Sequence, residues 1–354
     1  MKRRTFVRNS AAAGMAMTLP AFPDFLPELR EMRLGVAEAS YMMRAYRNIE
    51  SQAFPPFKDT LDMLEHCSEL GFGGAQLSIR GWDDAYANKV KKRADALGMF
   101  FEGSVRLPRS EEELPQFEKE VTAAAGIGVD VIRTVCLSGR RYENFESLES
   151  FTAFRADSIA ALQRAEPVMR QQRVKLAVEN HKDWRADEMK AILDGLGSEW
   201  IGVTLDTGNN ISLLEDPMEV VRQLAPYTFS VHLKDMGVTE YEDGFLLSEV
   251  NLGEGYLDIA EMVKVIREAS PEARFNLEMI TRDPLKVPCL TTGYWSTFDR
   301  IGSPELAAFL HQIRTHKSKG LPEVSQLSTD EQLRLEMENN RTCLLDAKAT
   351  YGFQ

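Results

Sequence analysis

Apolar and polar residues follow two repeating patterns from residue 33 onward. Short apolar runs of about seven residues, typical of buried strands, alternate with longer stretches in which Leu, Ile, Met and Val recur every three or four residues, as on one helix face. Helical stretches such as FKDTLDMLEHCSELGF and LDIAEMVKVIREA are of the second kind. The strand-like runs number eight, at residues 33–39, 73–79, 99–105, 130–136, 174–180, 200–206, 228–234 and 274–280.

This alternation predicts an α/β fold, a (β/α)8 TIM barrel with a C-terminal helical tail. Eight strand–helix units within about 280 residues suit a closed parallel barrel better than an open doubly wound sheet. No GxGxxG follows the first strand and no GxxxxGK[ST] occurs, so nucleotide-binding folds lose their main support. We expect the barrel at residues 30–316 and a polar tail at 317–354 with one helix near 329–347. The pattern leaves open whether the tail packs on the barrel or on a second subunit of a homo-oligomer.

The N-terminal stretch MKRRTFVRNSAAAGMAMTLPAF joins a basic start to an Ala-rich segment that is too short to span a bilayer. Arg3 and Arg4, followed by TFVR, resemble a twin-arginine export signal. We therefore expect residues 1–28 to be an export signal and the protein to be periplasmic. A disordered basic tail is the alternative, and it would leave the protein in the cytoplasm. No other segment approaches the roughly 18 apolar residues of a transmembrane helix.

Charge and cysteine content narrow the class of partner. The formal net charge of −12 and the pI near 5.1 argue against nucleic acid, whose binding depends on clustered Lys and Arg. The four cysteines are scattered without a CxxC, which argues against a zinc ribbon or a dense disulfide framework. A small molecule is the expected partner.

Polar residues end four consecutive strands of the predicted barrel. The fifth to eighth strands end in Glu179, Asp206, His232 and Glu278. Chemistry in a (β/α)8 barrel lies at the carboxyl ends of the strands, and neighbouring strands are about 5 Å apart. These side chains are therefore predicted to surround one divalent metal ion. Three carboxylates and one imidazole suit Mn²⁺ or Mg²⁺, with Co²⁺, Fe²⁺ and Zn²⁺ left open.

Other polar residues near these strand ends are candidates for binding substrate. Residues two apart share a face of a strand, so His181 is expected to point with Glu179, and Lys234 with His232. Arg282 lies just past the eighth strand. Arg133, in the otherwise apolar fourth strand, faces either the barrel mouth or a helix carboxylate. The alternative for these residues is a solvated position on the rim.

The motifs AVENH, TLDTGN, VHLKD, NLGEGYLDI and NLEM together resemble the xylose isomerase-like barrels of the sugar phosphate isomerase/epimerase superfamily. The resemblance covers roughly residues 33–315. It implies one divalent metal ion held by the four residues named above. It also implies that Glu179 and Glu278 are the acid/base pair, one removing a proton from the carbon next to a carbonyl and the other returning it.

The implied activity is that of a metal-dependent sugar isomerase or epimerase, because a metal on the carbonyl stabilises the enediolate. Export and the lack of a Gly-rich phosphate loop favour a free keto sugar or keto-glycoside over a sugar phosphate. A lyase that eliminates water from a keto-polyol, as inosose dehydratases do, remains open, as does a non-catalytic sugar-binding barrel. An abasic-site endonuclease is disfavoured, because its multi-zinc cluster needs many histidines and this chain contains only five.

Overall fold

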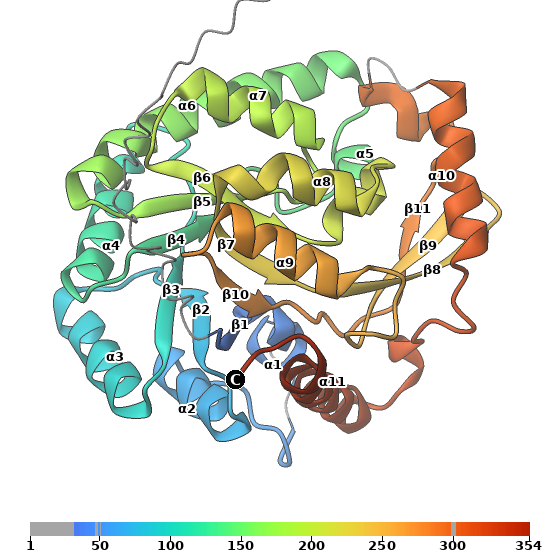
Figure 1. Cartoon of the computed structure of the whole chain (residues 1–354). Coiled ribbons are helices and arrows are strands. Elements are labelled where there is room, and N and C mark those ends of the chain that lie inside the picture. The colour runs from blue at the N-terminus through green and yellow to red at the C-terminus, as the bar shows by residue number, and fades with distance from the viewer. Residues whose placement is uncertain (1–31, 47–48, 50, 299–301) are drawn as a thin grey trace, which may run out of the picture. The chain divides into compact units, whose positions relative to one another are not determined.

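Eight parallel strands close into a barrel, as predicted (Figure 1). The computed structural model describes residues 32–46, 49, 51–298 and 302–354, and the expected export signal at 1–28 lies outside them. The strands follow one another around the barrel in the order β1, β10, β7, β6, β5, β4, β3 and β2. Their bounds are Leu34–Ala37 (β1), Gly74–Ser78 (β2), Phe100–Ser104 (β3), Val131–Thr134 (β4), Lys175–Glu179 (β5), Ile201–Asp206 (β6), Thr228–Leu233 (β7) and Arg274–Leu277 (β10). Each lies inside one of the eight apolar runs.

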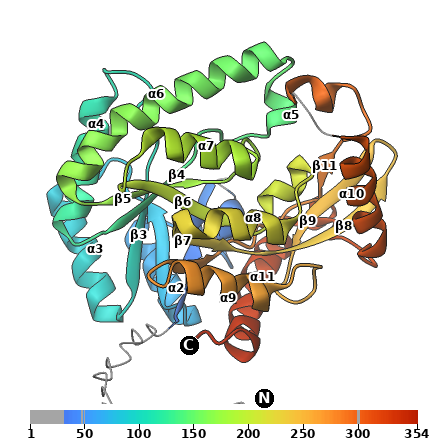
Figure 2. The ribbon, with the colours of Figure 1, turned by 45° about the horizontal axis from the view of Figure 1, so that its top comes forward.

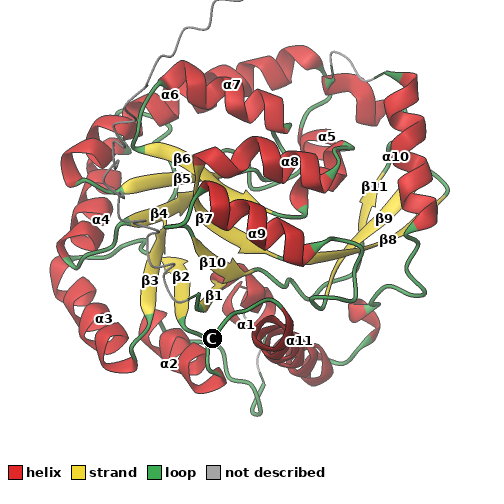
Figure 3. Ribbon diagram, in the orientation of Figure 1, coloured by secondary structure: helices red, strands yellow, loops and turns green. Residues whose placement is uncertain are grey.

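Helices between successive strands surround the barrel (Figure 3). They are α2 (Thr60–Leu70), α3 (Asp84–Leu97), α4 (Leu114–Gly126), α6 (Leu148–Gln172), α7 (Ala186–Leu196), α8 (Pro217–Leu224) and α9 (Ile259–Ala269). Side-chain oxygens cap several of their N-termini by accepting backbone N–H groups, and the capping residues are Asp59, Asp83, Ser147, Asp216 and Asp258. No helix of the described residues is long and apolar enough to cross a membrane.

The main core lies between the barrel and its helices. Every residue of β6 is buried, and Val203 and Leu205 are fully so. Full burial of such a side chain contributes about 1.5–3 kcal/mol, so the strands are fixed by their apolar neighbours. The barrel can therefore hold polar side chains at the carboxyl ends of its strands.

The sequence pattern did not predict a small antiparallel sheet, of which two strands follow the seventh barrel strand and one follows the eighth. It consists of β8 (Asp235–Tyr241), β9 (Gly244–Val250) and β11 (Leu285–Val287), in the order β11, β9, β8. Glu242 and Asp243 form the turn of the β8–β9 hairpin, just before a glycine, which is a recognisable hairpin signal. Helix α10 (Ser303–Thr315) packs beside this sheet, with the rings of Phe245 and Phe309 5.7 Å apart (Figures 1 and 2).

The C-terminal helix α11 spans Thr329–Thr350 and packs on the barrel of its own chain. It contacts the short segment after β1, which contains a 3-10 helix, η1 (Glu38–Tyr41), and α1 (Met42–Tyr46). The buried carboxylate of Glu336 accepts the backbone N–H of Met43 at 2.7 Å. Asn340 Nδ2 donates to the carbonyl oxygen of Ser40 at 2.9 Å. A further short helix, α5 (Arg141–Asn144), follows β4.

Candidate metal centre

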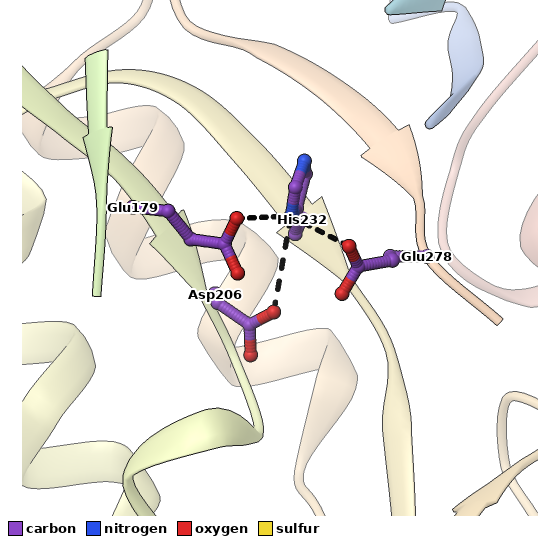
Figure 4. Close-up of side chains that lie close together, drawn as sticks. All are labelled: Glu179, Asp206, His232 and Glu278. Carbon is purple, nitrogen blue, oxygen red and sulfur yellow. Dashed lines mark ion pairs between the residues drawn. The ribbon is translucent and has the colours of Figure 1, made fainter. Parts of the chain in front are cut away.

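The four strand-end residues converge on one point at the mouth of the barrel (Figure 4). Glu179 ends β5, Asp206 ends β6, His232 lies near the end of β7, and Glu278 directly follows β10. All four side chains are buried, and one ligand atom from each lies within 4.8 Å of the others. This group could bind a metal ion.

The imidazole of His232 is oriented by a hydrogen-bond network beneath the site. Its Nε2 lies 2.7 Å from Gln76 Oε1, while Gln76 Nε2 donates to Glu102 Oε2 at 3.0 Å. Because the amide nitrogen of Gln76 is used in this way, its oxygen accepts the Nε2–H of His232. Nδ1 therefore faces the three carboxylates, and it is the nitrogen that a neutral ring would offer to a metal ion.

Among the atoms of the group, His232 Nδ1 is the strongest indication of a cation-binding site. It is buried, has no hydrogen-bond partner, and lies 3.2 Å from Glu278 Oε1, 3.5 Å from Glu179 Oε2 and 3.9 Å from Asp206 Oδ2. Three carboxylate oxygens and one imidazole nitrogen match the oxygen-rich set that Mg²⁺ and Mn²⁺ prefer. The residues present fit a divalent metal ion.

The electrostatics of the group point the same way. Burial opposes charge on His232, but the carboxylates of Glu278 and Glu179 raise its pKa to about 10. Burial raises the pKa of Asp206 to about 6, helped by the same two glutamates. Without a metal the centre therefore holds a proton between its carboxylates, and a metal ion would replace that proton.

Two cations hold the glutamates in place. Burial would raise the pKa of Glu179, but the guanidinium of Arg133, with Nε 2.8 Å from Oε2, keeps it below its usual value. Lys234 is fully buried, 2.7 Å from Asp206 Oδ2, and pairs with Glu278 on its other side. Both glutamates thus remain ionised bases.

A cavity of about 420 Å³ opens beside Glu278, which is the one of the four residues that lines it. Charged and polar residues dominate its lining, which includes Arg133, Arg140, His181, Lys182, Glu278 and Arg282. His181 Nδ1 lies 3.1 Å from the carbonyl oxygen of Gly139, and burial lowers its pKa to about 3, so the ring is neutral. Arg282 forms a two-pronged ion pair with Glu249 of β9, at 2.5 and 3.1 Å.

A family model described as the xylose isomerase-like TIM barrel matches residues 64–294. The chain belongs to this family. It is 26% identical over 242 residues to the 3-oxo-isoapionate decarboxylase of Pectobacterium atrosepticum, covering 67% of this chain and 81% of the relative.

Solved structures share the fold of this xylose isomerase-like barrel. One is a xylose isomerase-like TIM barrel protein from Mycobacterium smegmatis in complex with magnesium (TM-score 0.55, 16% identity, 79% of this chain and 98% of that one). Another is a D-psicose 3-epimerase determined in the presence of D-fructose (TM-score 0.56, 14% identity, 91% of this chain and all of that one).

Three of the four predicted substrate-binding residues of this xylose isomerase-like barrel line the cavity: Arg133, His181 and Arg282. Arg133 also faces Glu179, a strand-end carboxylate, and thus points toward the barrel mouth. Lys234 lies instead between two carboxylates of the metal group. Their contacts with substrate stay predictions.

The structure adds residues that the sequence reasoning had not selected. Asn209 Nδ2 donates to Glu179 Oε1 at 2.9 Å, and its backbone N–H donates to Asp206 Oδ1 at 2.7 Å. Its place just after the sixth strand, in TLDTGNN, was a usable signal. Lys182 could have been found in the same way, because it lies just after the fifth strand. Gln76 and Glu102 were detectable only as polar residues within apolar strands.

Proposed function

We propose that this xylose isomerase-like barrel is a divalent-metal-dependent sugar isomerase or epimerase. Its reaction is proton transfer through an enediolate, on a free keto sugar or keto-glycoside. The observation that carries the proposal is the buried group of three carboxylates around the unpartnered Nδ1 of His232 (Figure 4). The best-supported location is the periplasm, on the basis of the predicted twin-arginine signal at residues 1–28.

The positions of the two glutamates support proton transfer on opposite sides of a bound carbon. Their strands β5 and β10 are separated in the barrel by β6 and β7, so the carboxylates approach the centre from different sides. One glutamate, as a carboxylate, accepts the proton from the carbon next to the carbonyl, and the other, as a carboxylic acid, gives a proton to the opposite face. Arg133 and Lys234 favour the carboxylate forms of Glu179 and Glu278, so the glutamate that acts as the acid takes up its proton from the solvent before this step.

A bound divalent metal would be held by Glu179, Asp206, His232 and Glu278, and it would supply electrophilic stabilisation of the enediolate oxygens. The surrounding residues fix the geometry. Asn209 fixes Glu179 and Asp206 relative to each other, and Gln76 fixes the imidazole. The neutral ring of His181 is placed to accept a hydrogen bond from a substrate hydroxyl in the cavity.

Deuterium exchange tests this reaction. The purified protein, loaded with Mn²⁺, is incubated in D₂O with a panel of keto sugars and 3-keto-glycosides, and NMR records deuterium at the carbon next to the carbonyl. We expect exchange with the wild type and a loss of about 10²–10⁴-fold in Glu278→Gln, the range for removal of a general base. The matched control is Glu261→Gln, the same change of a carboxylate to a carboxamide on the outer helix α9. Exchange at an equal rate in Glu278→Gln would reject the role of that glutamate.

A lyase is the second candidate, and the relationship to a decarboxylase supports it. If the substrate carries a carboxylate next to the reacting carbon, the carbon–carbon bond breaks and CO₂ leaves. The bonding electron pair stays on the carbon as the enediolate, and a carboxylic acid then protonates it. Release of CO₂ identifies this route, a product lighter by one water identifies a dehydratase, and an isobaric product identifies an isomerase.

A further inference from the structure

Lys182 is a buried ammonium that forms no ion pair with the residues that the structure describes. It lies three residues beyond Glu179, its residue is 3% exposed, and its Nζ donates to Asn209 Oδ1. Among the residues that the structure describes, no carboxylate lies within ion-pair distance of it. The other cations of the barrel mouth differ, because Arg133, Lys234 and Arg282 each pair with a buried carboxylate.

A buried charge of this kind is costly unless something compensates it. Burial, reinforced by the nearby Lys234 and Arg282 and partly opposed by the carboxylates of Glu249 and Asp206, lowers the pKa of Lys182 to about 8, so the amine is still mainly protonated at neutral pH. An ammonium has three donors, and Asn209 uses one of them. The remaining donors are available to a ligand.

The cations that line the cavity are Arg133, Arg140, Lys182 and Arg282, and the carboxylates are Glu143 and Glu278. Three of these cations are already balanced, because Arg133 pairs with Glu179, Arg140 with Glu143 and Arg282 with Glu249. Lys182 forms no ion pair with the residues that the structure describes, so it is the cation of the lining that can attract and orient an anion beside Glu278.

We infer that Lys182 binds a carboxylate of the substrate, so that the substrate class is keto sugar acids. This inference rests on the proposed function, because it places the anionic group of the same substrate next to the same metal site. Phosphate shares the negative charge. Phosphoryl groups, however, are commonly held by several backbone N–H groups of a Gly-rich loop or helix N-terminus, whereas Lys182 offers a single side-chain ammonium. A carboxylate is the anion that this lining favours.

Isothermal titration of the Mn²⁺-loaded protein tests the inference without relying on turnover. The probes are 5-keto-D-gluconate, neutral D-fructose and D-fructose 6-phosphate. Lys182→Met removes the charge and keeps the length of the chain, and Lys182→Gln is a second variant with a polar side chain. Lys264→Met, on the exposed face of α9, is the matched control.

We expect 5-keto-D-gluconate to bind the wild type more tightly than D-fructose. The keto acid should lose about 30-fold or more in affinity in both Lys182 variants, as for a buried charge pair, while D-fructose changes less than about 2-fold. Lys264→Met should match the wild type. Unchanged D-fructose binding also shows that the metal site of the variants is intact.

The inference would be overturned if 5-keto-D-gluconate bound the wild type and both Lys182 variants equally well. It would also be overturned if the wild type did not bind 5-keto-D-gluconate. Tighter binding of D-fructose 6-phosphate, lost in the Lys182 variants, would overturn the carboxylate in favour of a phosphoryl group. The proposed function fails separately. Lys182-dependent binding of the keto acid without deuterium exchange would reject enolisation and leave the carboxylate site standing.

Discussion

At the scale of single residues, the metal group depends on side chains that do not themselves face the metal. Gln76 and Glu102 form a buried line below His232, and Asn209 joins Glu179 to Asp206. Such partners orient the ligands and hold the imidazole in one tautomer. The candidate site is therefore larger than the four residues that end the strands.

Gln76→Leu should weaken metal binding about 10–100-fold, because it removes the acceptor that orients the Nε2–H of His232. Titration of the metal-free protein with Mn²⁺ measures the dissociation constant. Gln171→Leu, an exposed substitution at the end of α6, is the control and should bind as the wild type does. An unchanged constant in Gln76→Leu would show that the network does not act on the metal site.

The strand-end residues were predictable from sequence, and their partners were not. Glu179, Asp206, His232 and Glu278 each stand out as a polar residue ending an apolar run, and the barrel brings such ends together. Gln76 lies inside a run, and only the closed barrel places it under His232, 156 residues away. Lys234 was predicted to bind substrate, and the structure places it between the carboxylates of Asp206 and Glu278. The sequence does not show this contact, because it depends on how neighbouring strands are staggered.

At the scale of elements, the C-terminal helix supports the strand end that carries Glu278. Asn340 of α11 holds the carbonyl oxygen of Ser40, and the hydroxyl of Ser40 donates to the carbonyl oxygen of Leu277 at 2.9 Å. The same hydroxyl accepts the backbone N–H of Met279 at 3.0 Å. These two bonds bracket Glu278, so α11 reaches the metal group through one serine.

Asn340→Leu should lower the free energy of unfolding by about 1–3 kcal/mol, because it leaves a buried carbonyl oxygen without its donor. It should also weaken Mn²⁺ binding, since the backbone around Glu278 loses support. Chemical denaturation and metal titration measure the two effects. Arg341→Ala, on the exposed side of α11, is the control. Full metal affinity in a destabilised Asn340→Leu would limit α11 to a structural role.

The elements differ in how well the sequence predicts them. All eight barrel strands are apolar runs flanked by long amphipathic helices, so periodicity finds them. The sheet of β8, β9 and β11 was missed because a single residue separates the end of β7 from the start of β8, so that the sequence of β8 was taken for the loop after the seventh strand. Helix α11 packs on its own barrel through a buried apolar face, which includes Leu344 and Ala347, and through the buried polar groups of Glu336 and Asn340, and periodicity alone does not reveal what such a face packs against.

At the scale of the whole molecule, a metal ion would join four strands of the barrel. The ligands come from β5, β6, β7 and the end of β10, which are neighbours around one side. Three of the four ligands are carboxylates, and a bound metal ion would reduce their mutual repulsion further than Arg133 and Lys234 do. The stability of the barrel should therefore depend on the metal.

Addition of Mn²⁺ at about 100 times its dissociation constant should stabilise the folded protein by about 2.7 kcal/mol, which corresponds to a rise in Tm of about 5 °C. Differential scanning calorimetry with and without a chelator measures this shift. Asp206→Asn, which removes one ligand charge, should show little or no shift. A wild type with the same Tm in both conditions would contradict metal binding in the folded state.

The central claim is that the four strand-end residues hold one divalent metal ion. Elemental analysis of the purified protein, before and after loading with Mn²⁺, Co²⁺ and Zn²⁺, tests it most directly, with Asp206→Asn and His232→Ala prepared in parallel. We expect one metal ion per chain in the wild type and a large loss in both variants. A wild type that holds no metal under any of these conditions would contradict the claim and leave a barrel that binds sugars without acting on them.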